Sequence, residues 1–151
     1  MVQSTRHSIN ELLVKLFYHV MDMEAKAVIT EEFSDITNND MHIIEAIGVD
    51  EPRNMSAIAG KRSITVSTLT TNMNGLEKKG YIRRERSQQV KRVVFVLLTE
   101  KGKRAFYHHR DFHKKMIKAI VRGLSDEEME ILQRCLVNLN GFLEAESEEN
   151  G

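Results

Sequence analysis

The sequence has one cysteine, one proline and no long apolar run. The single cysteine, Cys135, excludes an intramolecular disulfide, and such scarcity is typical of a reducing compartment. No stretch approaches the roughly 20 consecutive apolar residues that a membrane-spanning helix needs. The chain also does not begin with the basic segment and apolar run of a signal peptide. We therefore expect a cytoplasmic protein with no membrane partner.

Signatures of catalysis are also missing. The chain has no phosphate-binding glycine loop, nucleophile elbow or pair of carboxylates in a catalytic pattern. Cys135 lies on the apolar face of the last expected helix, where we expect a buried and inert thiol. A histidine-dependent hydrolase is a remote alternative. It would need a nucleophile near His109 or His113, and the sequence shows none. We expect a protein that is not an enzyme.

The charges balance at 22 against 22, but they are unevenly distributed. Residues 1–52 hold 3 basic and 10 acidic residues, whereas residues 53–104 hold 13 basic and 3 acidic residues. Residues 105–151 hold 6 basic and 9 acidic residues. A basic block between two acidic ones is typical of a nucleic-acid-binding module, although a solvated charged face has the same composition. The middle third is therefore where we look for a DNA-binding surface.

Apolar periodicity predicts a mainly α-helical chain with one small β-hairpin, which is an α+β organisation. A long first helix carries an apolar stripe from Ile9 to Val28. Shorter helices follow, one starting at Thr37 or Asn38 and stopping at Gly48, one from 54 and one from 65. The runs "YIRRER" and "RVVFVLLT" alternate as a hairpin does, and two more helices begin near Thr99 and at the capping box Ser125–Glu128.

The segment "TVSTLTTNMNGLEKKGYI", residues 65–82, is rich in poor helix formers, yet its spacing is helical. Val66, Leu69, Met73 and Leu76 fall on one face, which we expect to pack inward. Short polar side chains remain for the opposite face, and such side chains suit close approach to bases and phosphates. This pattern predicts the recognition helix of a helix-turn-helix, with the basic hairpin as its wing.

The expected DNA contacts come from the two helices of this motif and from the wing. On the helices they are Asn54, Ser56, Thr65, Ser67, Thr68, Thr70, Thr71, Asn72 and Asn74. On the hairpin they are Arg84, Arg86, Lys91 and Arg92, with Arg83 also available. The partner that this surface predicts is double-stranded DNA.

The run from "TVSTLTTNMNGLEKKGYIRRERS" to "KRVVFVLLTEKG" resembles the MarR family of winged helix-turn-helix repressors, and the resemblance covers nearly the whole chain. The family implies a transcriptional repressor that binds DNA as a homodimer. Its wing usually carries an acid two residues before the arginine, in an Asp-x-Arg motif. Here Val90 occupies the acid position and Arg92 is kept, so we expect a looser wing contact or one supplied by Lys91.

Within that family the chain looks most like FabT-type repressors of fatty-acid synthesis genes, through "MHIIEAIG", the "FHK" of residues 112–114 and "NLNGFLE". This resemblance implies no cofactor and a corepressor, a long-chain acyl group on acyl carrier protein (acyl-ACP). The apolar side chains available to an acyl chain are Phe17, Met21, Val28, Phe33, Met41, Ile44, Phe112 and Met116. Each of them is also ordinary core material, and Arg104, Arg110, Lys114 and Lys115 offer a basic surface to an acidic carrier.

The terminal helices carry more apolar surface than a small winged helix can cover, which predicts a two-fold dimer on a pseudo-palindromic operator. We therefore expect dimerisation helices in residues 1–36 and 100–146, a DNA-binding domain in residues 37–99, and a frayed acidic tail in residues 147–151. Four side chains also suggest an alternative, a zinc-responsive repressor of metal-uptake genes, as in zinc-sensing relatives. These are Glu24, His42, His109 and His113, although histidines on an apolar stripe are more often bonded core residues.

Overall fold

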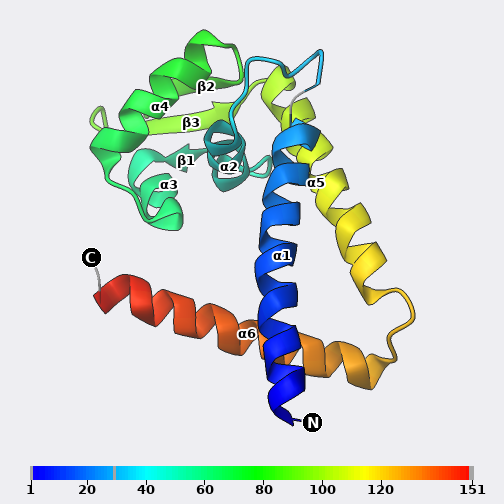
Figure 1. The fold of residues 1–151 in the computed structure, drawn as a ribbon. Helices are drawn as coiled ribbons and strands as arrows, with labels where there is room; N and C mark the ends of the chain where they lie inside the picture. The colour runs from blue at the N-terminus through cyan, green and yellow to red at the C-terminus, as the bar shows by residue number, and fades with distance from the viewer. Residues whose placement is uncertain (1, 29, 150–151) are drawn as a thin grey trace. The chain divides into compact units, whose positions relative to one another are not determined.

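The computed structural model describes residues 2–28 and 30–149, apart from the side chain of Val28. This part of the chain contains six α-helices and three β-strands (Figure 1). In order they are α1 (Val2–Val28), α2 (Asn38–Ile47), β1 (Arg53–Asn54), α3 (Met55–Arg62), α4 (Val66–Lys78), β2 (Ile82–Arg86), β3 (Val94–Leu98), α5 (Glu100–Val121) and α6 (Asp126–Glu149). They form two compact units, the first ending at Phe112 and the second beginning at His113.

The helix starts follow the capping residues that the sequence predicts. Thr37 and Asp40 form a reciprocal capping box at α2, Asn54 caps α3, and Thr65 caps α4. The capping box predicted at Ser125 and Glu128 is confirmed, because the Ser125 N–H donates to Glu128 over 2.8 Å and the Glu128 N–H donates to the Ser125 hydroxyl over 3.2 Å. Each cap satisfies N–H groups that a helix start leaves without an internal partner, so these boundaries are set locally.

The wing is a three-stranded antiparallel sheet with the strand order β1-β3-β2. The predicted hairpin of β2 and β3 is confirmed, with Ile82 opposite Leu98 and Arg86 opposite Val94. The sequence did not predict β1, whose two residues pair with Val96 and Phe95. Because β1 runs directly into α3, the wing is hydrogen-bonded to the start of the helix-turn-helix.

The core of the first unit lies between α2, α3, α4, the sheet and the start of α5 (Figure 1). Its fully buried members include Ile44, Leu69, Met73, Tyr81 and Val96. One helix-to-strand junction is especially close, because a Cβ added to Gly102 would meet the Tyr81 carbonyl oxygen at 2.0 Å. The Thr99 hydroxyl donates to the Gly80 carbonyl over 2.6 Å at the same junction. The "LTEKG" run therefore packs the start of α5 against the residues that follow α4.

Three predictions about apolar and terminal residues are corrected by the structure. Val66 is 44% exposed, because it lies in the first turn of α4 beyond the edge of the core. Cys135 is exposed in the single chain rather than buried. α6 continues through Glu149, so residues 147–149 are helical, while residues 150 and 151 lie outside the described part. Among the described helices, none combines the length and apolar character needed to cross a membrane.

Candidate nucleic-acid interface

The recognition helix α4 has one buried face and one polar face. Leu69, Met73 and Leu76 are fully buried and hold the helix to the first unit. On the polar face Ser67, Thr68, Thr71 and Asn74 are exposed, while Thr70 and Asn72 are half-buried. Apart from Val66, this division matches the prediction, and it leaves a row of short side chains on the surface.

Several of these hydroxyl groups donate within the helix. Thr70 donates to the Val66 carbonyl over 2.8 Å, and Thr71 makes a longer bond of 3.5 Å to the Ser67 carbonyl. Thr65 accepts from the Thr68 N–H as the N-cap. The hydroxyl protons of Thr70 and Thr71 are therefore directed to the helix backbone, which leaves their oxygens available as acceptors. Such a face suits base groups that donate, and it suits phosphate oxygens less well.

The start of α3 and the tip end of the wing border an open hollow of about 360 Å³. Asn54 uses its side-chain oxygen to cap α3, accepting from the Ala57 N–H over 2.8 Å. Ser56 is exposed in the first turn of the same helix. The hollow is lined by Asn54, Met55, Ser56, Val66, Arg92, Val93 and Val94. The structure therefore brings wing residue Arg92 beside the first turns of both helices of the motif.

The wing tip is ordered by a serine. The Ser87 hydroxyl accepts from the N–H groups of Gln89 and Val90, each over 3.2 Å. The Val93 N–H closes the turn on the Val90 carbonyl over 2.9 Å, and the Val90 side chain is exposed. The tip thus forms a compact turn with valine at the position of the family's usual acid. A serine at the start of a polar loop is the signal that could have predicted this turn.

Arg84 is the wing residue that contacts the recognition helix. Its Nε donates to Glu77 Oε2 over 3.1 Å, and its Nη2 donates to Asn74 Oδ1 over 2.8 Å. The hydrogen bond and charge of Arg84 hold the pKa of Glu77 below its usual value. Two residues expected to be free for DNA, Asn74 and Arg84, are therefore bonded to each other.

The end of the recognition helix is anchored by two partly buried polar contacts. Lys79 donates to Asp40 Oδ2 over 2.8 Å, which ties the end of α4 to the capping box of α2. Tyr81 is fully buried and donates to Asp35 over 2.6 Å, while the Lys101 ammonium lies 4.2 Å from the centre of its ring. The Tyr81 bond lowers the pKa of Asp35, and burial together with that carboxylate raises the pKa of Tyr81.

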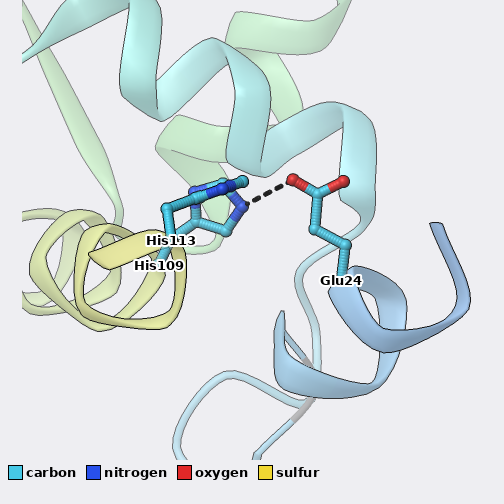
Figure 2. A group of neighbouring side chains, drawn as sticks. All are labelled: Glu24, His109 and His113. Carbon is cyan, nitrogen blue, oxygen red and sulfur yellow. Dashed lines mark hydrogen bonds and ion pairs between the residues drawn. The ribbon is translucent and has the colours of Figure 1, made fainter. Parts of the chain in front are cut away.

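His109 joins three helices of the first unit. Its Nδ1 lies 2.8 Å from Glu45 of α2, and its Nε2 lies 3.2 Å from Glu24 of α1 (Figure 2). The imidazole is 1% exposed, and carboxylates beside both nitrogens favour the doubly protonated form. Burial alone would lower the pKa of His109, but Glu45 and Glu24 together raise it.

Three of the four expected metal ligands are grouped. Glu24, His109 and His113 each offer a ligand atom, and these atoms lie within 4.8 Å of one another. The two histidines are one turn apart on α5. His42 instead faces Glu45, with its Nδ1 3.5 Å from the carboxylate. One carboxylate and two imidazoles are a donor set that zinc accepts, with Glu45 placed to orient His109 from its other nitrogen.

The side chains expected to hold an acyl chain do not share one environment. Phe33, Met41 and Ile44 are buried in the core, whereas Phe17 and Met21 are exposed on α1 in the single chain. Phe112 and Met116 are half-buried on α5, and the side chain of Val28 lies outside the described residues.

A helix-turn-helix with an exposed polar recognition helix and a basic wing defines a DNA-binding protein of the winged-helix class. The MarR family profile matches residues 36–94. Streptococcus pneumoniae FabT, solved in complex with DNA, is 38% identical with a TM-score of 0.84, over 93% of this chain and 98% of that chain. The chain belongs to the MarR family, and it is a DNA-binding transcriptional regulator rather than an enzyme.

Two further relatives support this assignment. The regulator PchR of Bacillus subtilis (strain 168) is 29% identical over 155 aligned residues, which are 94% of this chain and 91% of PchR. S. aureus MepR, solved in a complex with DNA, is 25% identical with a TM-score of 0.67, over 89% of this chain and 97% of that chain.

Proposed function

We propose that this protein is a homodimeric repressor of fatty-acid synthesis genes, with long-chain acyl-ACP as its corepressor. The observation that carries the proposal is the likeness to FabT along nearly the whole of both chains. Function depends on the sites that a fold carries, so a match that includes the terminal helices is more informative than one restricted to the DNA-binding centre.

The DNA-binding part of the proposal rests on the exposed polar face of α4 and on the wing. Ser67, Thr68 and Asn72 would face base edges, and Ser56, Arg86, Lys91 and Arg92 would contact phosphates or a minor groove. Thr65 and Asn54 act first as helix caps, so their contribution to DNA binding would come through the placement of the helix starts.

A dimer is supported by unpartnered apolar side chains on the terminal helices. α1 exposes Leu12, Leu16 and Phe17, and α6 exposes Leu136 and Phe142. Exposed rows of large apolar side chains mark protein interfaces. A two-fold pair of recognition helices would bind half-sites about one helical turn, ~34 Å, apart.

Operator affinity in the presence of acyl-ACP tests the effector. Genome-wide footprinting would first provide the operator, and binding would then be measured with long-chain acyl-ACP, with unacylated ACP as the matched control. We expect sites upstream of fatty-acid synthesis genes and tighter binding with the acylated carrier alone. Equal affinity with both carriers would remove the corepressor from the proposal and leave DNA binding in place.

A second candidate, a zinc-responsive repressor of metal-uptake genes, is favoured by the grouping of Glu24, His109 and His113. Metal analysis of protein purified without a histidine tag distinguishes the two candidates. Stoichiometric zinc that is removed by chelation together with operator affinity would support this candidate, as would footprints upstream of metal transporters.

A further inference from the structure

The guanidinium of Arg84 bridges the wing and the recognition helix. Arg84 lies on β2, whereas its acceptors Glu77 and Asn74 lie on α4, seven and ten residues earlier in the chain. Its Nη2 makes a second, shorter contact with the same oxygen of Glu77. A planar guanidinium that bonds through two nitrogens fixes direction as well as distance, which an ammonium group does not.

Arg86 provides an internal comparison on the same strand. Both arginines lie on one side of β2, because strand side chains alternate and the two are separated by a single residue. The Arg84 side chain is 28% exposed, while the Arg86 side chain is exposed and makes no hydrogen bond or ion pair within the described ranges. Of these two arginines, Arg86 can therefore approach a phosphate without first breaking a side-chain contact.

We propose that Arg84 is a positioning residue, which sets the angle between wing and recognition helix through Glu77 and Asn74, and that it is not itself a phosphate contact. Exposed ion pairs contribute little to stability, so the function of this one is orientation. The sheet is joined to α3 through β1 on one side, and the Arg84 contact joins it to α4 on the other. Together the two links place the wing relative to both helices that approach DNA.

The removal of Glu77 tests the proposal by the sign of its effect. A carboxylate on a DNA-binding helix repels phosphates, so Glu77→Ala would ordinarily tighten DNA binding. If Glu77 holds Arg84 in place, the same change weakens binding instead. The probe is a duplex of about 30 base pairs, long enough for two half-sites, selected by the wild-type protein from a random-sequence library. Fluorescence anisotropy over a range of salt concentrations gives the affinity and its salt dependence.

We expect Glu77→Ala and Arg84→Ala each to weaken binding about fivefold, and the double variant to be no worse than either one, as for residues that act as a unit. The salt slope stays unchanged in both single variants. Arg86→Ala is the matched control, and we expect it to reduce the slope by about 1.8, because each of the two subunits would lose one phosphate contact worth about 0.9. The exchange of Glu77→Arg with Arg84→Glu restores the ion pair and should recover most of the affinity.

Tighter binding by Glu77→Ala would overturn the proposal, as would a loss of salt slope in Arg84→Ala equal to that in Arg86→Ala. Additive effects in the double variant would overturn it as well. Thermal unfolding of each variant ensures that affinities are compared between folded proteins. Glu77→Gln keeps an acceptor oxygen for Arg84 with little change in shape, so it should bind DNA more tightly than Glu77→Ala if the hydrogen bond is what matters.

Discussion

Gly102 lies where α5 passes closest to the end of the recognition helix, and Gly102→Ala is therefore expected to destabilise the protein. A Cβ at this position would meet the Tyr81 carbonyl oxygen at 2.0 Å and the Leu98 Cβ at 3.3 Å, whereas ordinary contact begins at 3.4 Å. The obstructing atom belongs to the backbone, and it also accepts the Thr99 N–H over 3.0 Å. Relief of the clash requires α5 to move by more than about 1 Å, which disturbs that bond.

The expected cost is set by two opposing effects. Overpacking of a close contact costs about 1–3 kcal/mol, and more where the backbone must shift. Alanine in place of glycine within a helix contributes about 1 kcal/mol in the opposite direction. We therefore expect a net loss of about 2 kcal/mol, which lowers the urea midpoint by about 1 M for a chain of this size.

The assay is urea unfolding followed by circular dichroism at one fixed protein concentration, since the stability of the proposed dimer would depend on concentration. Gly75→Ala is the matched control, because Gly75 lies within α4 and nothing stands within 4 Å of its added Cβ. It should stabilise the protein by up to about 1 kcal/mol. If Gly102→Ala proved as stable as the wild type, the close approach of α5 to Tyr81 would be refuted.

Three further predictions follow from buried or strained positions. Tyr81→Phe should cost about 1–2 kcal/mol near neutral pH, and the deficit should shrink as pH falls through the lowered pKa of Asp35, because a depressed carboxyl pKa stabilises the fold only above it. Ser63 has a φ of +52°, so Ser63→Val should cost about 1–2 kcal/mol in thermal unfolding while Ser63→Gly is tolerated. His109→Leu should cost about 3 kcal/mol near pH 6, because it removes the imidazolium that lies between Glu24 and Glu45. That cost should fall as pH rises through the raised pKa of His109, since its stabilisation is complete only below 6.5, and an equal cost at all pH values would contradict a charged imidazole.

Most of the fold was predictable because its signals are local. Helix caps such as Thr37, Asn54 and Ser125 act within four residues, and the buried face of α4 follows directly from helical spacing. The strand β1 was not predictable, because two residues carry no periodicity and pair only with a strand some forty residues later. The prediction that Val66 is buried was wrong. Helical spacing identifies the apolar face of α4, but it does not show at which turn of the helix the core ends.

The residues of the candidate site could be predicted from the sequence, but most of the hydrogen bonds between them could not. Sequence reasoning identified the polar face of α4 and the basic wing, which are properties of residue type and order. It did not predict that Arg84 bonds to Asn74, or that Thr70 directs its proton into its own helix. Those contacts depend on the orientation of β2 against α4 and on the rotamers chosen there, and neither leaves a pattern in the chain.

A single oxygen of Asp40 serves two elements at once. It accepts the Thr37 N–H at the start of α2 over 3.0 Å and the Lys79 ammonium at the end of α4 over 2.8 Å. The connection from α1 to α2 and the end of the recognition helix therefore share one charged acceptor, so that neither can shift without changing the hydrogen bonding of the other. Coupling of this kind is reciprocal: a ligand that displaces the first turn of α2 changes the free energy of DNA binding, and bound DNA changes the affinity for that ligand by the same factor.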